Sequence, residues 1–178
     1  ARLTPPKARW PVNAVTPCPL DMVGYWRLDE ETSGSYEDDY GSHDGACAGS
    51  CPAPTGGVIG DAQQFSRATG TGIDIPGDIF DWGDGESFSV EFWMAEPGDV
   101  SGNAVIVGRQ GPTHPNPHIW IGVTGGGVAN FSLYASDGDD DSIQGTTDLT
   151  TGPWHHIVAI YDASGPGTLR LYVDGEEE

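Results

Sequence analysis

Residues 152–175 read GPWHHIVAIYDASGPGTLRLYVDG, and this stretch decides the fold class of the 178-residue chain. Trp154 opens an apolar run at residues 157–161 that is rich in β-branched side chains and too short for a helix. A turn rich in Gly and Pro follows at residues 162–168. Residues 169–173 then alternate apolar and polar side chains. This spacing and turn chemistry predict a β-hairpin.

Other segments of the chain show the same pattern of short strands and turns. Residues 87–94 (SFSVEFWM) alternate strictly between two faces. One face carries Phe88, Val90, Phe92 and Met94, and the other carries Ser89, Glu91 and Trp93. Further short apolar runs are found at residues 20–28, 63–65, 72–75, 104–108, 119–123 and 130–135. No segment keeps helical periodicity over three turns. The sequence therefore predicts an all-β protein, an antiparallel β-sandwich of the jelly-roll type.

The chain divides into a short arm and one domain. Residues 1–19 contain five prolines and no hydrophobic period, which is typical of an extended arm or linker. Residues 20–178 are expected to form a single β-sandwich domain. Within it, the acidic segments 29–54 and 136–148 lack a hydrophobic period, and we expect both to be loops.

The charge balance excludes one class of partner. Asp and Glu total 27 against 7 Lys and Arg, which gives a formal net charge of −20. Such a surface repels phosphate backbones, so nucleic-acid binding is not expected. It favours divalent cations and high solubility, although acidic loops that merely keep a secreted protein soluble would give the same composition. No apolar window is long enough to predict a membrane span.

Three cysteines are too few for a disulfide scaffold, but two of them are close in sequence. Cys47 and Cys51 stand in CAGSC, four positions apart in a loop that contains Gly. A metal or redox site would need a CxxC motif or a further Cys or His at ligand spacing, and the sequence contains neither. We therefore predict a local disulfide between them and, with it, an oxidising extracytoplasmic compartment. Cys18 then remains as a free thiol, an exchange partner or a link to another chain.

Strand parity predicts a ligand-binding surface. If Phe88, Val90 and Phe92 face the core, Glu91 and Trp93 face outward, and the same alternation applies to the other strands. The outward set mixes aromatic rings with hydrogen-bonding groups, as a surface that stacks on sugar rings would. Its members are Glu91, Trp93, Trp120, Tyr134, Arg170 and Tyr172. The alternative is that these rings cover the sheet or pack under loops. His155 and His156 belong to a strand, and at most one of them faces outward.

The order of these motifs resembles that of laminin G-like domains of the concanavalin A-like superfamily. The similar stretches are PLDMVGYWRLDE, YEDDYGSHDG, GVIGDAQQFSRATGTGIDIP, ESFSVEFWM, AVIVGR, HIWIGVTGGGVANFSLY, GPWHHIVAIYD and LRLYVDG. Together they cover about residues 20–175. The resemblance implies a possible calcium site in the Asp-Gly loop, at Asp38, Asp39 and Asp44, because oxygen ligands suit this hard ion. It also implies closing strands after residue 175, which this chain lacks, so a downstream segment or another chain is expected to complete the sheet.

These observations favour a non-catalytic module. We expect an extracellular or cell-surface recognition or adhesion domain of a larger protein, which binds carbohydrate or a surface protein with calcium support. The alternative is a structural or interaction subunit of an extracellular assembly, docking through its N-terminal arm or an open sheet edge. A polysaccharide-cleaving enzyme comes last, because glycoside hydrolysis needs two facing carboxylates and Glu91 has only Ser89 and Trp93 as neighbours on its face.

Overall fold

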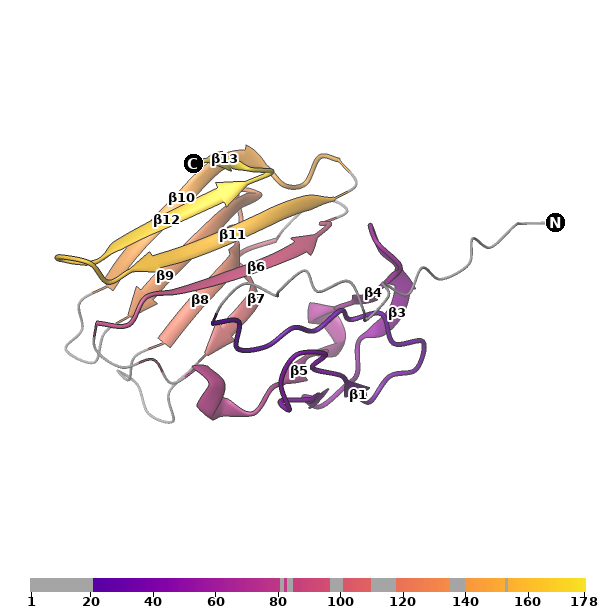
Figure 1. The fold of residues 1–178 in the computed structure, drawn as a ribbon. Coiled ribbons are helices and arrows are strands. Elements are labelled where there is room, and N and C mark those ends of the chain that lie inside the picture. The colour runs from indigo at the N-terminus through magenta and orange to yellow at the C-terminus, as the bar shows by residue number, and fades with distance from the viewer. Residues whose placement is uncertain are drawn as a thin grey trace. The chain divides into compact units, whose positions relative to one another are not determined.

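The computed structural model describes residues 21–80, 82, 85–96, 101–109, 118–134, 140–152 and 154–178, the side chains of Asp78 and His118 excepted. The expected proline-rich arm, with Cys18, lies outside these residues. The chain forms two compact units, Ala1–Asp81 and Trp82–Glu178. Figure 1 shows the strands of both units. The prediction of one sandwich domain across residues 20–178 stays a prediction.

The second unit is built from two four-stranded antiparallel sheets. One has the strand order β13-β12-β11-β6, with β6 at Phe88–Met94, β11 at His155–Asp162, β12 at Thr168–Val173 and β13 at Glu176–Glu177. The other has the order β10-β9-β8-β7, with β7 at Ala104–Arg109, β8 at His118–Val123, β9 at Val128–Tyr134 and β10 at Asp140–Asp148. This is the predicted all-β antiparallel sandwich.

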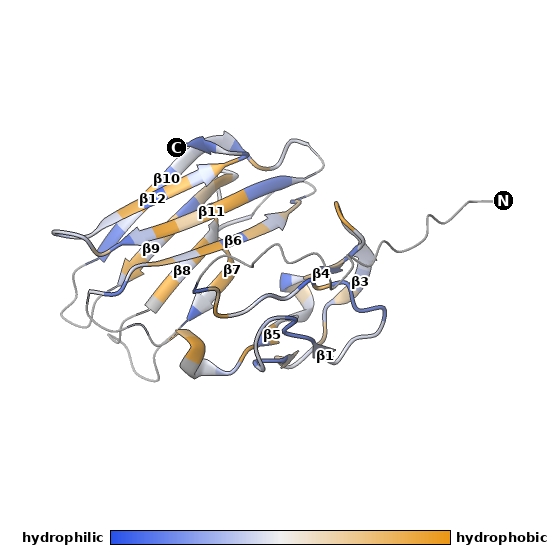
Figure 2. Cartoon of the chain, viewed as in Figure 1, coloured by the Kyte–Doolittle hydropathy of each residue, from blue (hydrophilic) through white to orange (hydrophobic). Residues whose placement is uncertain are grey.

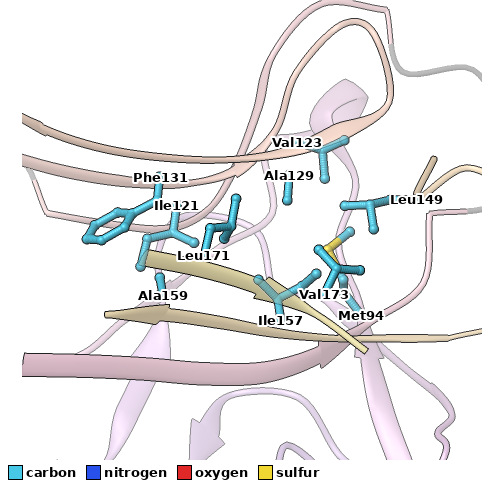
Figure 3. Close-up of a cluster of buried hydrophobic side chains, with 10 residues drawn as sticks. All are labelled: Met94, Ile121, Val123, Ala129, Phe131, Leu149, Ile157, Ala159, Leu171 and Val173. Carbon is cyan, nitrogen blue, oxygen red and sulfur yellow. The ribbon is translucent and has the colours of Figure 1, made fainter. Parts of the chain in front are cut away.

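The inward faces of the two sheets share one hydrophobic core. It contains Met94, Ile121, Val123, Ala129, Phe131, Leu149, Ile157, Ala159, Leu171 and Val173, all of them buried. Figure 3 shows these side chains between strands of both sheets, which is the packing expected of a sandwich. Phe88, Val90 and Phe92 pack against this cluster, so the predicted parity of β6 is confirmed. Figure 2 shows the alternation of hydropathy along β6 and the continuous apolar run in the middle of β11.

A two-residue turn joins β12 to β13. Val173 pairs with Glu176, which leaves Asp174 and Gly175 as the turn, and their φ angles are 54° and 89°. Two positive φ angles are characteristic of a type I′ turn, which Asp-Gly forms readily because Gly has no Cβ. The backbone N–H of Glu178 then donates to the carbonyl of Leu171 at 2.9 Å. The edge of β12 thus pairs with this short strand.

The first unit contains smaller sheets. A three-stranded sheet has the order β1-β2-β5, with β1 at Ser35–Tyr36, β2 at Gly45–Cys47 and β5 at Ile73–Asp74. A hairpin pairs β3, Ala53–Gly56, with β4, Asp61–Gln64. Two 3₁₀-helices follow β4, η1 at Arg67–Thr69 and η2 at Gly77–Phe80. The described part of the chain contains no helix with the length and apolar character that a membrane crossing requires.

Three local expectations are corrected. The apolar run at 20–28 does not form a strand in its described part, residues 21–28, where the one pairing is an isolated bridge between Trp26 and Asp38. The expected loop at 29–54 contains β1, β2 and the start of β3. The described residues of the second acidic segment form β10, because its pairing with β9 and the buried Leu149 that follows it outweigh its polar composition.

Candidate functional site

The predicted ligand-binding residues lie on two different sheets. Glu91 and Trp93 belong to β6, and Arg170 and Tyr172 belong to β12, so these four share the outer face of one sheet. Trp120 and Tyr134 belong to β8 and β9 of the other sheet. Since the inner faces of both sheets pack on one core, their outer faces point away from each other. The six residues therefore do not form a single surface.

The outer face of β6, β11 and β12, which we name the recognition face, is open to solvent. Trp93 is 48% exposed. Its ring lies beside the imidazole of His156 on β11, with 4.9 Å between the ring centroids and 32° between the planes. The register pairs Trp93 with His156 directly, which explains this contact. One side of the indole is thus supported by a neighbour while much of its surface stays available to a ligand.

A carboxylate flanks the two rings. Glu91 lies two residues before Trp93 on β6 and therefore on the same face. Its side chain is 69% exposed, and its Oε2 is 3.9 Å from Nε2 of His156. The apolar side chains of Val158 and Ile160, both half-buried, continue the face along β11. The arrangement presents a stacking ring, an apolar floor and an acceptor next to it.

Tyr172 and Arg170 border the other side of the recognition face. Tyr172 pairs with Val158 of β11 on one side and with Glu177 of β13 on the other. Arg170 is exposed, and its guanidinium lies 3.8 Å from the carboxylate of Asp162 at the end of β11. An exposed pair of this kind contributes little stability. The pair does, however, keep the carboxylate of Asp162 beside the guanidinium of Arg170 on this border.

The outer face of β8 and β9 differs in accessibility. Trp120 pairs with Ser132, and Gly122 pairs with Asn130, so these residues share the side opposite to the core. Asn130 and Ser132 are nevertheless 2% and 3% exposed, and Asn130 Nδ2 donates to Ser132 Oγ at 2.8 Å. Trp120 and Tyr134 are half-buried. The burial of Trp120 and Tyr134 agrees better with rings that cover the sheet than with rings that bind a ligand.

A histidine clasp fixes the end of β11 next to the recognition face. His155 is buried, and its Nδ1 lies 2.8 Å from Asp174 Oδ2 while its Nε2 lies 2.9 Å from the carbonyl oxygen of Thr151. The hydrogen bond with Asp174 raises the pKa of His155, burial opposes this, and the Thr151 carbonyl adds to the increase. The backbone N–H of His156 donates to Asp174 Oδ1 at 2.9 Å. The same carboxylate thus contacts the ring of His155 and the backbone of His156, and the sequence pattern indicated neither contact.

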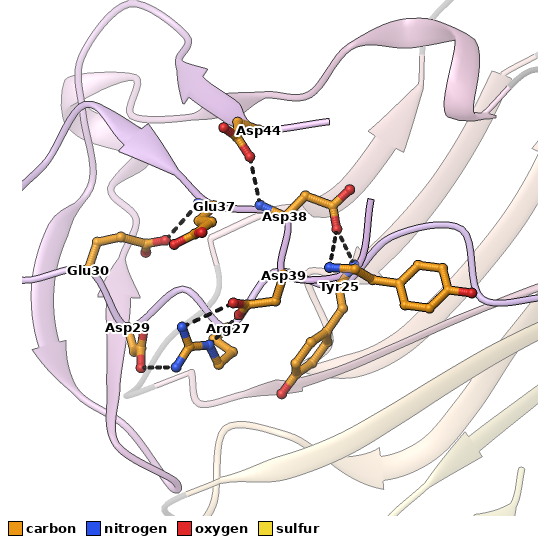
Figure 4. A network of polar contacts seen from close by, with 9 residues as sticks. Tyr25, Arg27, Asp29, Glu30, Glu37, Asp38, Asp39 and Asp44 are labelled. Atoms are coloured by element: carbon orange, nitrogen blue, oxygen red, sulfur yellow. Dashed lines mark hydrogen bonds and ion pairs between the residues drawn. The ribbon is translucent and has the colours of Figure 1, made fainter. Parts of the chain in front are cut away.

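The Asp-Gly loop of the first unit is organised around a buried carboxylate. Asp38 Oδ1 accepts hydrogen bonds from the N–H groups of Tyr25 and Tyr40, at 2.9 Å and 3.1 Å, and Oδ2 accepts from that of His43 at 3.2 Å. Burial alone would raise the pKa of Asp38. The N–H groups of Gly41, Tyr25, Tyr40 and His43 outweigh it and hold the pKa well below the ordinary 3.8. Figure 4 shows part of this network.

The other acidic residues predicted for calcium also have protein partners. Asp39 forms an ion pair with Arg27, and Asp44 Oδ1 accepts the N–H of Asp38 at 3.0 Å. In the described residues, no three His, Cys, Asp or Glu side chains are grouped as a metal site requires. In this arrangement Asp38 turns its oxygens toward N–H donors and the guanidinium of Arg27 pairs with Asp39, so a calcium ion would have to displace these partners. Calcium binding at this loop stays a prediction.

The predicted disulfide is present. Cys47 at the end of β2 and Cys51 are joined by a bond of 2.06 Å, with 4.9 Å between the Cα atoms. Pro52, the next residue, is fully buried, and its carbonyl accepts a hydrogen bond from Ser33 Oγ at 3.1 Å. The bridge therefore closes a short loop that is anchored on both sides.

Comparisons with known proteins agree with this geometry. A laminin G-type family model, described as the Concanavalin A-like lectin/glucanases superfamily, matches residues 67–178. Among solved structures, the chain is similar to the crystal structure of part of an S-layer domain-containing protein from Clostridium thermocellum. The identity is 22%, the match covers 86% of this chain and 69% of that chain, and the TM-score is 0.56, which shows the fold alone. Comparison with curated proteins found no match.

Proposed function

Because the chain belongs to the laminin G-like family of the Concanavalin A-like lectin/glucanases superfamily, we propose that it is a non-catalytic recognition module that binds carbohydrate. The binding surface is the recognition face on β6, β11 and β12. The observation that supports this most directly is the exposed indole of Trp93, positioned by His156 and flanked by Glu91. A ring held in this way offers a flat apolar surface with polar groups beside it, which suits the face of a sugar.

The position of the carboxylates favours binding over hydrolysis. Paired residues place Glu91, Val158, Tyr172 and Glu177 in one row across four strands. Three strand spacings of about 4.8 Å separate Glu91 from Glu177, or about 14 Å in total. Glycosidases hold their two carboxyl groups about 5–10 Å apart. These two carboxylates are therefore too distant to act together on one glycosidic bond.

Cell-surface location belongs to the same proposal. The disulfide between Cys47 and Cys51 agrees with an oxidising compartment. The similar structure from Clostridium thermocellum comes from an S-layer domain-containing protein. An acidic module with an exposed aromatic face would serve there as an adhesion or recognition part of a larger protein.

A glycan array tests the proposal. The full chain is applied to immobilised oligosaccharides beside two variants, Trp93→Ala and Trp120→Ala, with circular dichroism confirming that each is folded. We expect the wild type and Trp120→Ala to bind the same glycans and Trp93→Ala to lose them. Repeating the array with calcium and with chelator tests the separate calcium prediction.

The outcomes separate the candidate functions. Equal binding by wild type and Trp93→Ala would show that the recognition face is not the binding site. Silence of the folded wild type on all glycans would contradict the carbohydrate proposal, and the protein-interaction alternative would then be the one to pursue. Release of reducing sugar from any bound glycan would contradict a non-catalytic role.

A further inference from the structure

We propose that the recognition face selects a saccharide that carries protonated amino groups, such as an oligomer of glucosamine, over neutral and anionic saccharides. This inference rests on the function proposed above and names the ligand class of the same surface. The charges around the face and the position of one carboxylate beside the stacking ring lead to it.

Carboxylates surround the recognition face. Glu91 lies within it, and Glu177 lies on its β13 border. Asp162 marks the end of β11, and Asp174 follows directly after β12. The chain as a whole has a formal net charge of −20. The field at this surface therefore attracts cations and repels sulfated or carboxylated glycans.

The basic side chains of the face, Arg170 and His156, already lie close to carboxylates. Arg170 has Asp162 at 3.8 Å, and His156 has Glu91 at 3.9 Å. Recognition of an anionic sugar would need a guanidinium whose donors are available for two parallel hydrogen bonds. Arg170 would have to leave Asp162 for that purpose, and the incoming anion would then face the released carboxylate.

Glu91 is positioned to select a cation on the stacked sugar. It lies on the same face as Trp93, two residues away, or about 6.6 Å along the strand. A sugar stacked on the indole thus reaches the carboxylate with its ring substituents. An ammonium substituent would gain from the carboxylate and from the π-face of Trp93, whereas a neutral acetamido group would gain only a hydrogen bond. We expect about five- to tenfold tighter binding of the amino form from these exposed interactions.

Titration calorimetry with three oligosaccharides of equal length tests this inference. The probes are a glucosamine oligomer, its fully N-acetylated form and a heparin-derived oligomer, at about pH 5, where the amino groups of glucosamine are protonated. We expect the glucosamine oligomer to bind most tightly, the N-acetylated oligomer to bind more weakly, and the heparin fragment not to bind. Raising the salt concentration should weaken only the binding of the glucosamine oligomer.

Two matched variants locate the selectivity. Glu91→Gln removes the carboxylate beside Trp93, and Asp141→Asn removes the same charge from exposed β10 on the other sheet. Glu91→Gln should reduce affinity for the glucosamine oligomer about fivefold more than affinity for the N-acetylated form, because only the ammonium group loses a charge–charge interaction. Asp141→Asn should change neither affinity.

Each outcome bears on a different claim. Equal affinity of Glu91→Gln and wild type for the glucosamine oligomer, or tighter binding of the neutral form, overturns the selectivity and leaves carbohydrate binding intact. If Asp141→Asn loses as much affinity for the glucosamine oligomer as Glu91→Gln does, the overall charge causes the attraction, and the proposed selectivity is also overturned. Absence of binding to all three probes, together with a silent glycan array, contradicts the proposed function itself.

Discussion

Replacing Asp174 with Asn tests whether the clasp holds His155 as an imidazolium cation. Nδ1 of His155 faces the Asp174 carboxylate at 2.8 Å, and Nε2 faces the Thr151 carbonyl at 2.9 Å. Both partners accept hydrogen bonds and cannot donate them, so the ring must donate from both nitrogens and carry a positive charge. The raised pKa of His155 agrees with this geometry.

The expected effect is moderate because Asp174 is partly exposed. A hydrogen bond between charged groups contributes about 1.5–3 kcal/mol. The Asp174 side chain is 47% exposed, and screening by solvent lowers this to about 1 kcal/mol. In the Asn variant, the amide oxygen can still accept the N–H of His156, and the amide nitrogen can donate to a neutral His155. Only the part that depends on charge is therefore lost.

The sign of the pH dependence follows from both groups. His155 has a raised pKa, so its contribution to stability is fully present below the ordinary 6.5 and is lost as the pH rises through the folded pKa. The N–H of His156, and then His155, lower the pKa of Asp174, so its contribution is present above 3.8 and is lost as the pH falls through the folded pKa. The clasp is strongest between 3.8 and 6.5.

Urea unfolding of the wild type and Asp174→Asn at about pH 5 and about pH 9 measures this. We expect a difference of about 1 kcal/mol at the lower pH that shrinks toward zero at the higher pH. Asp162→Asn, at the other end of β11, is the matched control and should show no change of its effect over this range. A loss in Asp174→Asn that is equal at both pH values would refute the charged clasp, as would a His155 NMR titration with a midpoint at or below the ordinary value.

Three further perturbations test the packing and the first unit. Leu171→Ala removes a fully buried side chain and should lower the free energy of unfolding by about 2–5 kcal/mol, whereas Val105→Ala, at an exposed position, should change it by less than about 0.5 kcal/mol; urea unfolding measures both, and similar losses would contradict the assigned core. Reducing the Cys47–Cys51 bond should lower stability by about 2 kcal/mol, seen as a lower melting temperature with reductant; an unchanged melting curve would remove its structural role. Asp38→Ala leaves the backbone donors of Tyr25, Tyr40 and His43, among others, unpaired and should cost at least about 3 kcal/mol of local stability, measured by faster amide exchange at His43; unaltered exchange would show that the carboxylate does not organise the loop.

The sandwich core could be predicted because alternation is a local signal. Successive side chains on β6, β11 and β12 point to opposite faces of the sheet, so a sheet with one buried face needs an apolar residue at every second position. The same signal correctly turned Glu91 and Trp93 outward. Polar segments gave no such signal. In β10, Ile143 lies between the polar Ser142 and Gln144, and the strand forms because β9 supplies its hydrogen-bonding partners.

The candidate site depended on information that alternation does not contain. Whether Trp120 shares a face with Trp93 is decided by strand order, which brings β6 beside β11 and β8 beside β9. His156 joined the site for the same reason, since its pairing with Trp93 crosses more than sixty positions of sequence. The partners of Asp38 could not be predicted either, because backbone N–H groups of the folded loop supply them.

The proposed function depends on binding of sugar by the recognition face through Trp93. Two-dimensional NMR of the full chain, titrated with a glycan identified on the array, tests it most directly. We expect the signals of Glu91, Trp93, His156 and Tyr172 to shift with a common dissociation constant, while those of Asn130 and Ser132 stay in place. Shifts confined to the β8–β9 face, or to the Asp38 loop, would contradict it.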